Sequence, residues 1–178
     1  AAQAIHAGKV LGWFQGRMEF GPRALGNRSM LARPTEGRIN DWLNRRLDRS
    51  EFMPFAPSVL AEHADELFVG VGKARHTAEF MTVTFDVKPD WRSRIPAVVH
   101  VDGTARPQLV FEEESPRYYK LIQAFQEKTG VPLILNTSFN VKGEPIVATP
   151  EDAWNTFMKS DMDLLVLENF IIYKEKNT

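Results

Sequence analysis

Three short segments of the sequence carry residues that could bind anions or move protons. The first, QGRMEFGPRALGNRS at residues 15–29, places Arg23 and Arg28 among three glycines. Glycine permits close backbone approach, and exposed amides beside guanidinium groups can cradle an anion. The segment has neither the GxxxxGK[ST] nor the GxGxxG pattern, so it matches no common nucleotide-binding motif. A structural loop, with its arginines paired to Glu19 or to backbone carbonyls, explains it equally well.

The second segment is HVDGTARPQ, which contains His100, Asp102, Thr104 and Arg106 at every second position. If a strand continues through it, these four side chains share one face. Such a face could hold a phosphate, a magnesium ion or a proton relay. A polar strand edge with an Asp-Gly turn is the simpler interpretation, since a lone histidine is more often structural than catalytic.

The third segment, LNTSFN, follows a run of apolar residues and presents Asn136, Thr137, Ser138 and Asn140. In open α/β sheets, ligands bind just beyond the carboxyl ends of strands. Amides and hydroxyls at such a place can hydrogen-bond phosphate or ribose without adding charge. A turn built from Asn and Ser side chains is nearly as well supported. A serine nucleophile is less well supported, because there is no GxSxG pattern.

Apolar periodicity predicts the elements that must position these segments. Strands are predicted at residues 9–16, 28–34, 54–60, 79–87, 97–104, 131–136, 163–168 and 170–174. Helices are predicted near residues 1–8, from residue 35 to about 47, at 61–70, at 115–130 and from residue 149, with a loop at 70–78. No regular βαβ alternation and no repeat is present, so we expect one mixed-sheet α/β or α+β domain over residues 1–178. Residues 1–8 are interpreted as the end of a helix that begins upstream.

Composition narrows the classes of function. With 43% apolar and 25% charged residues, the chain is typical of a folded globular domain. The absence of cysteine excludes disulfides, thiolate zinc sites and a cysteine nucleophile. Four scattered histidines do not indicate a metal site. No apolar run is long enough for a membrane helix and no signal peptide is recognisable, so we expect a cytoplasmic protein without membrane contact.

Charge is unevenly distributed. Residues 17–49 hold eight arginines, no lysine and four acidic residues, although the whole chain has a net charge of -1. Arginine suits bidentate contact with phosphate or carboxylate, so this region indicates an anionic partner; a solvated basic face is the alternative. The pI near 6.5 argues against nucleic acid as that partner.

Together, QGRMEFGPRALGNRS, PFAPSVL, HVDGTARPQ and TGVPLILNTSFNVKGEPIVATPEDA, in this order, closely resemble the C-terminal region of the O-carbamoyltransferases that act on nodulation factors and antibiotics. The resemblance spans nearly the whole chain. It implies a YrdC-like α/β fold with a twisted mixed sheet and packed helices. It also implies that this domain binds ATP with Mg²⁺ and carbamoyl phosphate and forms carbamoyl-adenylate. A separate N-terminal Kae1-like domain, with an Fe-type metal, would then transfer the carbamoyl group to an acceptor hydroxyl.

The resemblance also gives the candidate residues roles. Arg23, Arg106 and Ser138 are the expected catalytic residues, because charge compensation and positioning are what such a transfer needs. The expected binding residues are Arg28, Arg49, His100, Asp102, Thr104, Asn136, Thr137 and Asn140.

Met53 is one departure from the family pattern, since many relatives have arginine there, and methionine cannot supply the charge with which an arginine could contact a ligand. Two alternative functions remain at this point. A double-stranded RNA-binding module would use the concave basic surface of a YrdC-like domain. A threonylcarbamoyl-adenylate synthase would share the fold and the nucleotide chemistry but use threonine and bicarbonate.

Overall fold

The structure, a computed structural model, describes residues 1–37 and 55–174. Its main element is a seven-stranded mixed sheet with the order β6-β3-β7-β2-β1-β8-β9. The strands are β1 (Leu11–Phe14), β2 (Arg28–Ala32), β3 (Ala56–Leu60), β6 (Gln108–Val110), β7 (Leu133–Ser138), β8 (Leu164–Leu167) and β9 (Phe170–Tyr173). The pairs β1/β8 and β3/β6 are parallel, and the other neighbours are antiparallel. A small second sheet pairs β4 (Phe85–Asp86) with β5 (Thr104–Ala105).

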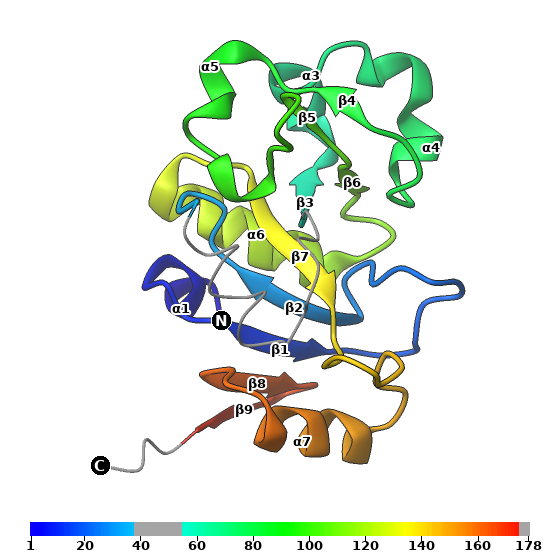
Figure 1. Ribbon diagram of the computed structural model, residues 1–178, viewed down its shortest axis with the longest axis vertical. Helices are drawn as coiled ribbons and strands as arrows, with labels where there is room; N and C mark the ends of the chain where they lie inside the picture. The colour runs from blue at the N-terminus through cyan, green and yellow to red at the C-terminus, as the bar shows by residue number, and fades with distance from the viewer. Residues whose placement is uncertain (38–54, 175–178) are drawn as a thin grey trace.

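The helices lie around this sheet as Figure 1 shows. In the described residues they are α1 (Ala2–His6), α3 (Ala64–Leu67), α4 (Arg75–Ala78), α5 (Pro89–Arg92), α6 (Pro116–Thr129) and α7 (Pro150–Lys159). The 3₁₀ turns η1 (Ala61–His63), η2 (Val71–Ala74) and η3 (Pro96–Val98) accompany them in the same part of the chain. Helices α3, α4 and α5 and the small sheet gather at one end of the molecule, and α7 lies at the other (Figure 1).

Helix α6 anchors the central part of the sheet. Pro116 begins it, Gly130 ends it in a left-handed conformation, and it packs on β3, β7 and α1. Its buried face carries Tyr118, Leu121, Ile122 and Phe125, and each of the last three side chains contributes roughly 1.5–3 kcal/mol on burial. The helix predicted at residues 115–130 is therefore confirmed.

Helix α7 is fixed at its start by a reciprocal cap. Asp152 N donates to Thr149 Oγ1 and Thr149 N donates to the Asp152 carboxylate. These two bonds satisfy backbone groups that the first helical turn would otherwise leave open. They also hold the pKa of Asp152 below its usual range. The helix predicted from residue 149 is confirmed, and α7 packs on β1 and β8.

Two of the predicted strands are mostly wrong. Of residues 79–87, only Phe85–Asp86 form a strand, because Met81 adopts a positive φ of 53° and the Thr82 hydroxyl donates to Thr77 O. The chain therefore turns after Met81 and lies against α4 instead of continuing as a strand. Of residues 97–104, only Thr104 is in a strand, since η3 occupies the start and a turn from His100 to Gly103, closed by Gly103 N donating to His100 O at 2.9 Å, occupies the end.

Smaller differences concern helix limits and one loop. Residues 70–78 contain η2 and α4 where a loop was expected. The helix predicted at 61–70 is split into η1 and α3 and ends at Leu67. Strand β6 was not predicted, because three residues give too short a pattern to recognise. The helix predicted from residue 35 lies mostly outside the described residues.

Candidate functional site

The first candidate segment is the loop that joins two neighbouring strands, β1 and β2. These strands are antiparallel, with Phe14 opposite Arg28, so residues 15–27 leave the sheet and return beside it. Gly26 has a positive φ of 101°, and a side chain there would overlap the ring of Tyr118. Glycine is therefore required where this loop lies against α6.

A small pocket brings together five of the predicted site residues. It has a volume of about 100 Å³ and contains Arg23, Arg106, Asn136, Thr137 and Ser138. The remaining lining residues are Pro22, Ala24, Phe55, Ala56 and Met81. All three candidate segments thus contribute to one pocket, which we call the arginine pocket. It lies where β7 ends and β3 begins, at one edge of the central sheet.

The two arginines of this pocket make no ion pair with any described residue. Arg106 is half-buried, and its Nε atom is buried without a hydrogen-bond partner. Burial lowers the pKa of Arg106, and the like charge of Arg23 lowers it further. A buried donor without an acceptor is unfavourable unless a ligand completes it. The pocket therefore favours an anion.

Asn136 is fully buried in the wall of the arginine pocket. Its Nδ2 atom donates to Ala24 O at 3.1 Å, Ser58 Oγ at 3.0 Å and Gln108 Oε1 at 3.2 Å. Because Ala24 O can only accept, the amide nitrogen must face it. Its Oδ1 atom is buried with no hydrogen-bond partner. An unpaired acceptor suits a ligand N–H donor and does not suit a phosphate oxygen.

Thr137 and Ser138 end β7, where their side chains are half-buried. The pairing of β7 with β2 sets Ser138 opposite Ser29 and Thr137 opposite Met30. Both residues line the pocket. Their hydroxyls can donate to a ligand oxygen without adding charge.

His100, Asp102 and Thr104 do not line the arginine pocket. They form a tight turn, in which the Asp102 carboxylate accepts from Thr104 N at 2.9 Å and Thr104 Oγ1 at 2.8 Å. His100 Nδ1 lies 2.9 Å from Thr104 Oγ1. The Thr104 bonds lower the pKa of Asp102, and burial lowers the pKa of His100. The expectation that a strand aligns them with Arg106 is wrong, because this turn intervenes.

Three other predicted site residues lie elsewhere. Arg28 is buried, stacks 3.5 Å over the ring of Phe14, and donates to the carbonyls of Gln15 at 2.9 Å and Gly16 at 2.9 Å. Asn140 holds its own loop through Val141 O and Glu144 O. Arg49 falls outside the described residues, as does Met53.

Sequence reasoning missed several residues of the arginine pocket. Phe55 and Ala56 stood in the PFAPSVL motif but carry no reactive group. Met81 reaches the pocket through its left-handed backbone, which no pattern indicated. Gln108 does not line the pocket but accepts from Asn136 Nδ2 at 3.2 Å. Its position two residues after Arg106, at the end of the HVDGTARPQ motif, was the one sequence signal that could have drawn attention to it.

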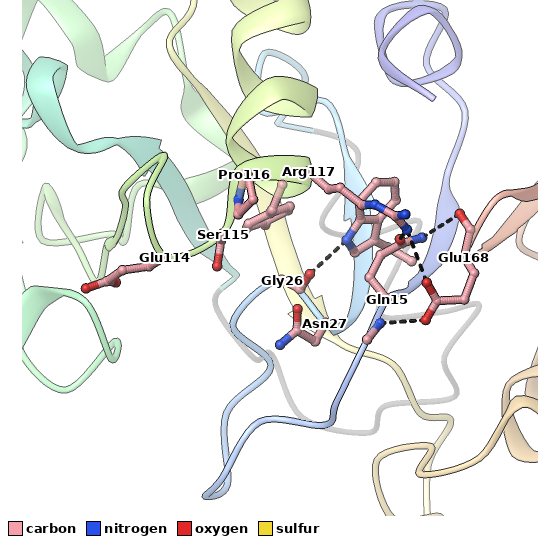
Figure 2. Close-up of a pocket in the computed structure, with 11 residues that line it drawn as sticks. Gln15, Gly26, Asn27, Glu114, Ser115, Pro116, Arg117 and Glu168 are labelled. Carbon is pink, nitrogen blue, oxygen red and sulfur yellow. Dashed lines mark hydrogen bonds and ion pairs between the residues drawn. The ribbon is translucent and has the colours of Figure 1, made fainter.

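A larger cavity, of about 420 Å³, borders both ends of the same loop. It is lined by Trp13, Gln15, Gly16, Gly26, Asn27, residues 114–118 and Glu168. Figure 2 shows Arg117 reaching from α6 toward Gln15 and Glu168. Arg117 donates to Gln15 Oε1 at 2.9 Å and to the Glu168 carboxylate at 3.1 Å. Its charge is therefore already compensated, and the cavity contains no predicted site residue.

Comparison with known proteins identifies the family. The family model described as Carbamoyltransferase C-terminus matches residues 2–174. Nodulation protein NolNO of Sinorhizobium fredii is 47% identical over 175 residues, which is 98% of this chain and 26% of that protein. The chain belongs to the carbamoyltransferase C-terminus family, and it spans about a quarter to a third of the length of the curated relatives it matches.

Solved structures show the fold. Full-length HypF, in its phosphate- and nucleotide-bound form, has a TM-score of 0.68 at 20% identity, covering 98% of this chain and 25% of that one. Sua5 of P. abyssi, complexed with L-threonine, has a TM-score of 0.62 at 14% identity, and the match covers 94% of this chain and 45% of that one. The predicted YrdC-like α/β fold is confirmed. Within the described residues, no helix combines the length and the hydrophobicity needed to cross a membrane.

Proposed function

We propose that this domain binds ATP and carbamoyl phosphate in the arginine pocket and joins the carbamoyl group to AMP. The observation that carries the proposal is the pair Arg23 and Arg106, which share one pocket and lack any ion pair with described residues. Two polyanionic substrates repel each other, so fixed cations are what such a site must provide. Membership of the carbamoyltransferase C-terminus family supports the same chemistry.

Each pocket residue has a role in this proposal. Arg106 and Arg23 hold phosphate oxygens and compensate the charge that develops on them. The hydroxyls of Thr137 and Ser138 donate to further oxygens. The unpaired Oδ1 of Asn136 accepts a hydrogen bond from the carbamoyl amino group. An acceptor in this position distinguishes a carbamoyl group from a third phosphate.

The pocket is small relative to an entire nucleotide, so the proposal places only the reacting groups in it. No carboxylate is among the described residues that line it. Magnesium would therefore enter bound to the ATP phosphates, which it commonly bridges. One water would be consumed: it would cleave carbamoyl phosphate to phosphate and carbamate, and a carbamate oxygen would then form a bond to the α-phosphorus of ATP as the bond to pyrophosphate breaks. Transfer of the carbamoyl group to an acceptor hydroxyl would belong to an N-terminal Kae1-like region of the complete protein.

Release of pyrophosphate tests this function directly. We expect the chain to release pyrophosphate from ATP and magnesium when carbamoyl phosphate is present. Threonine with bicarbonate should not replace carbamoyl phosphate. Release that requires threonine would instead identify a threonylcarbamoyl-adenylate synthase. Calorimetry that detects neither ATP nor carbamoyl phosphate binding to the folded chain would rule the proposal out.

Duplex RNA is a less well supported ligand. Arg28 is buried among backbone carbonyls, and Arg33 donates to Glu36 at 2.5 Å. Two of the eight clustered arginines are thus already engaged within the protein. Strongly salt-dependent RNA binding that ATP does not displace would revive this alternative.

A further inference from the structure

Every backbone carbonyl from Ala24 to Gly26 accepts a hydrogen bond from a side chain in another part of the fold. Asn136 Nδ2 donates to Ala24 O at 3.1 Å, Gln108 Nε2 to Leu25 O at 2.7 Å, and Trp13 Nε1 to Gly26 O at 2.8 Å. The donors come from β7, β6 and β1. We call residues 24–28 the pinned segment.

The backbone amides of residues 25–28 also donate hydrogen bonds to side chains. The Glu19 carboxylate oxygen Oε1 accepts from Leu25 N at 2.6 Å, Asn27 N at 2.8 Å and Arg28 N at 3.2 Å. Gly26 N donates to Ser29 Oγ at 3.1 Å. Three bonds converge on one ionised oxygen, and bonds to a charged acceptor are roughly twice as strong as neutral ones.

Arg23 immediately precedes this segment, and its own surroundings are different. Residues 20–23 are exposed, and no hydrogen bond joins them to another described residue. The orientation of the Arg23 side chain is therefore determined by the residues that follow it in the chain. The carbonyl of Ala24 and both peptide groups of Leu25 supply that constraint.

The hydrogen bonds around Gln108 require an amide side chain at this position. It is 5% exposed, and its Oε1 accepts from Ser58 Oγ at 2.7 Å and from Asn136 Nδ2 at 3.2 Å while its Nε2 donates to Leu25. A glutamate of the same shape would set an oxygen against the Leu25 carbonyl oxygen, and a leucine would leave several buried groups unpaired. Only an amide donates and accepts in this way at this size.

We infer that Gln108 and Glu19 are positioning residues for Arg23. Gln108 donates to a backbone carbonyl of the pinned segment, and Glu19 accepts from its backbone amides. Neither residue lines the arginine pocket. The inference rests on the proposed function, in which Arg23 binds a substrate phosphate. Misplacement by about 1 Å of a group that orients a substrate is enough to lower activity strongly.

Gln108→Glu tests the inference by calorimetric titration of the chain with ATP and magnesium. We expect ATP affinity to fall about tenfold, because a charge-assisted bond to phosphate is weakened. The matched control is Gln123→Glu, which adds the same charge at an exposed position of α6 with no hydrogen bond to lose. It should bind ATP within about twofold of the unmodified chain.

A double-mutant cycle separates positioning from general loss of structure. In an Arg23→Ala background, adding Gln108→Glu should change ATP affinity less than about twofold, because the group it positions is gone. An equal loss of affinity in both backgrounds, or wild-type affinity for Gln108→Glu, would overturn the inference alone. If the unmodified chain does not bind ATP, the proposed function fails and the inference with it.

Glu19 provides a second route if Gln108→Glu does not fold. Glu19→Gln retains a carbonyl oxygen that can accept from the three amides, whereas Glu19→Ala removes the acceptor. We expect ATP affinity to fall about tenfold in Glu19→Ala and to recover most of that loss in Glu19→Gln. Equal affinities for the two variants would contradict a positioning role.

Discussion

Two of the cavities that border the loop between β1 and β2 differ in how their arginines are paired. The larger cavity contains Arg117, which is bonded to Gln15 and Glu168. The smaller one contains Arg106 and Arg23, which have no ion-pair partner among the described residues. A charge that is paired within the protein has a structural role, whereas the unpaired, half-buried charge of Arg106 is unfavourable until an anion binds. Charge pairing therefore identifies the candidate site where volume would have selected the other cavity.

The largest effect that tests this comparison should come from Arg106→Ala. We expect ATP affinity, measured by calorimetry, to fall about a hundredfold, as for removal of a preorganised charged donor. The free energy of unfolding should not fall, because the side chain has no acceptor to lose and repels Arg23. Arg117→Ala is the control and should lower ATP affinity less than about threefold. Similar losses of ATP affinity in both variants would contradict the assignment of ATP binding to the smaller cavity.

A smaller effect is expected from Arg28→Met, and it should appear in stability. Arg28 donates to the carbonyls of Gln15 and Gly16, two residues that line the larger cavity. Its removal should lower the free energy of unfolding in urea by about 2–3 kcal/mol, because buried acceptors are left unpaired. Arg33→Met, which loses a partly exposed ion pair with Glu36, should cost less than about 1 kcal/mol. Normal stability with lost ATP binding would instead make Arg28 a ligand residue.

The smallest effect concerns the protonation of His100 beside the arginine pocket. Burial lowers its pKa from the usual 6.5, Asp102 raises it and Arg106 lowers it. The neutral ring's contribution to stability is therefore complete above about pH 6.5, and it declines as the pH falls toward the lowered pKa. Titration by NMR should give a midpoint below 6.5. Asp102→Asn should lower that midpoint and Arg106→Ala should raise it; no change in either variant would show that the His100 ring does not sense these charges.

Elements with complete local signals could be predicted from the sequence. The buried stripe of α6 between Pro116 and Gly130, and the cap of α7 at Thr149, are determined by neighbouring residues. Residues 79–87 alternate like a strand yet mostly do not form one, because Met81 is buried in the folded chain with a positive φ that its residue type does not favour. The period-two pattern of HVDGTARPQ failed for a related reason, since the Asp102 and Thr104 bonds close a turn within it.

The sequence by itself determined the family, the class of fold and the three segments that hold candidate chemistry, since those depend on residue types in a fixed order. Only the tertiary structure decided which arginines face a ligand. Arg23 and Arg28 are five residues apart in one loop, yet the first borders the pocket and the second is buried beneath backbone carbonyls. The physical reason is that a guanidinium group binds a substrate only where the fold leaves it unpaired, and pairing depends on residues far away in the chain.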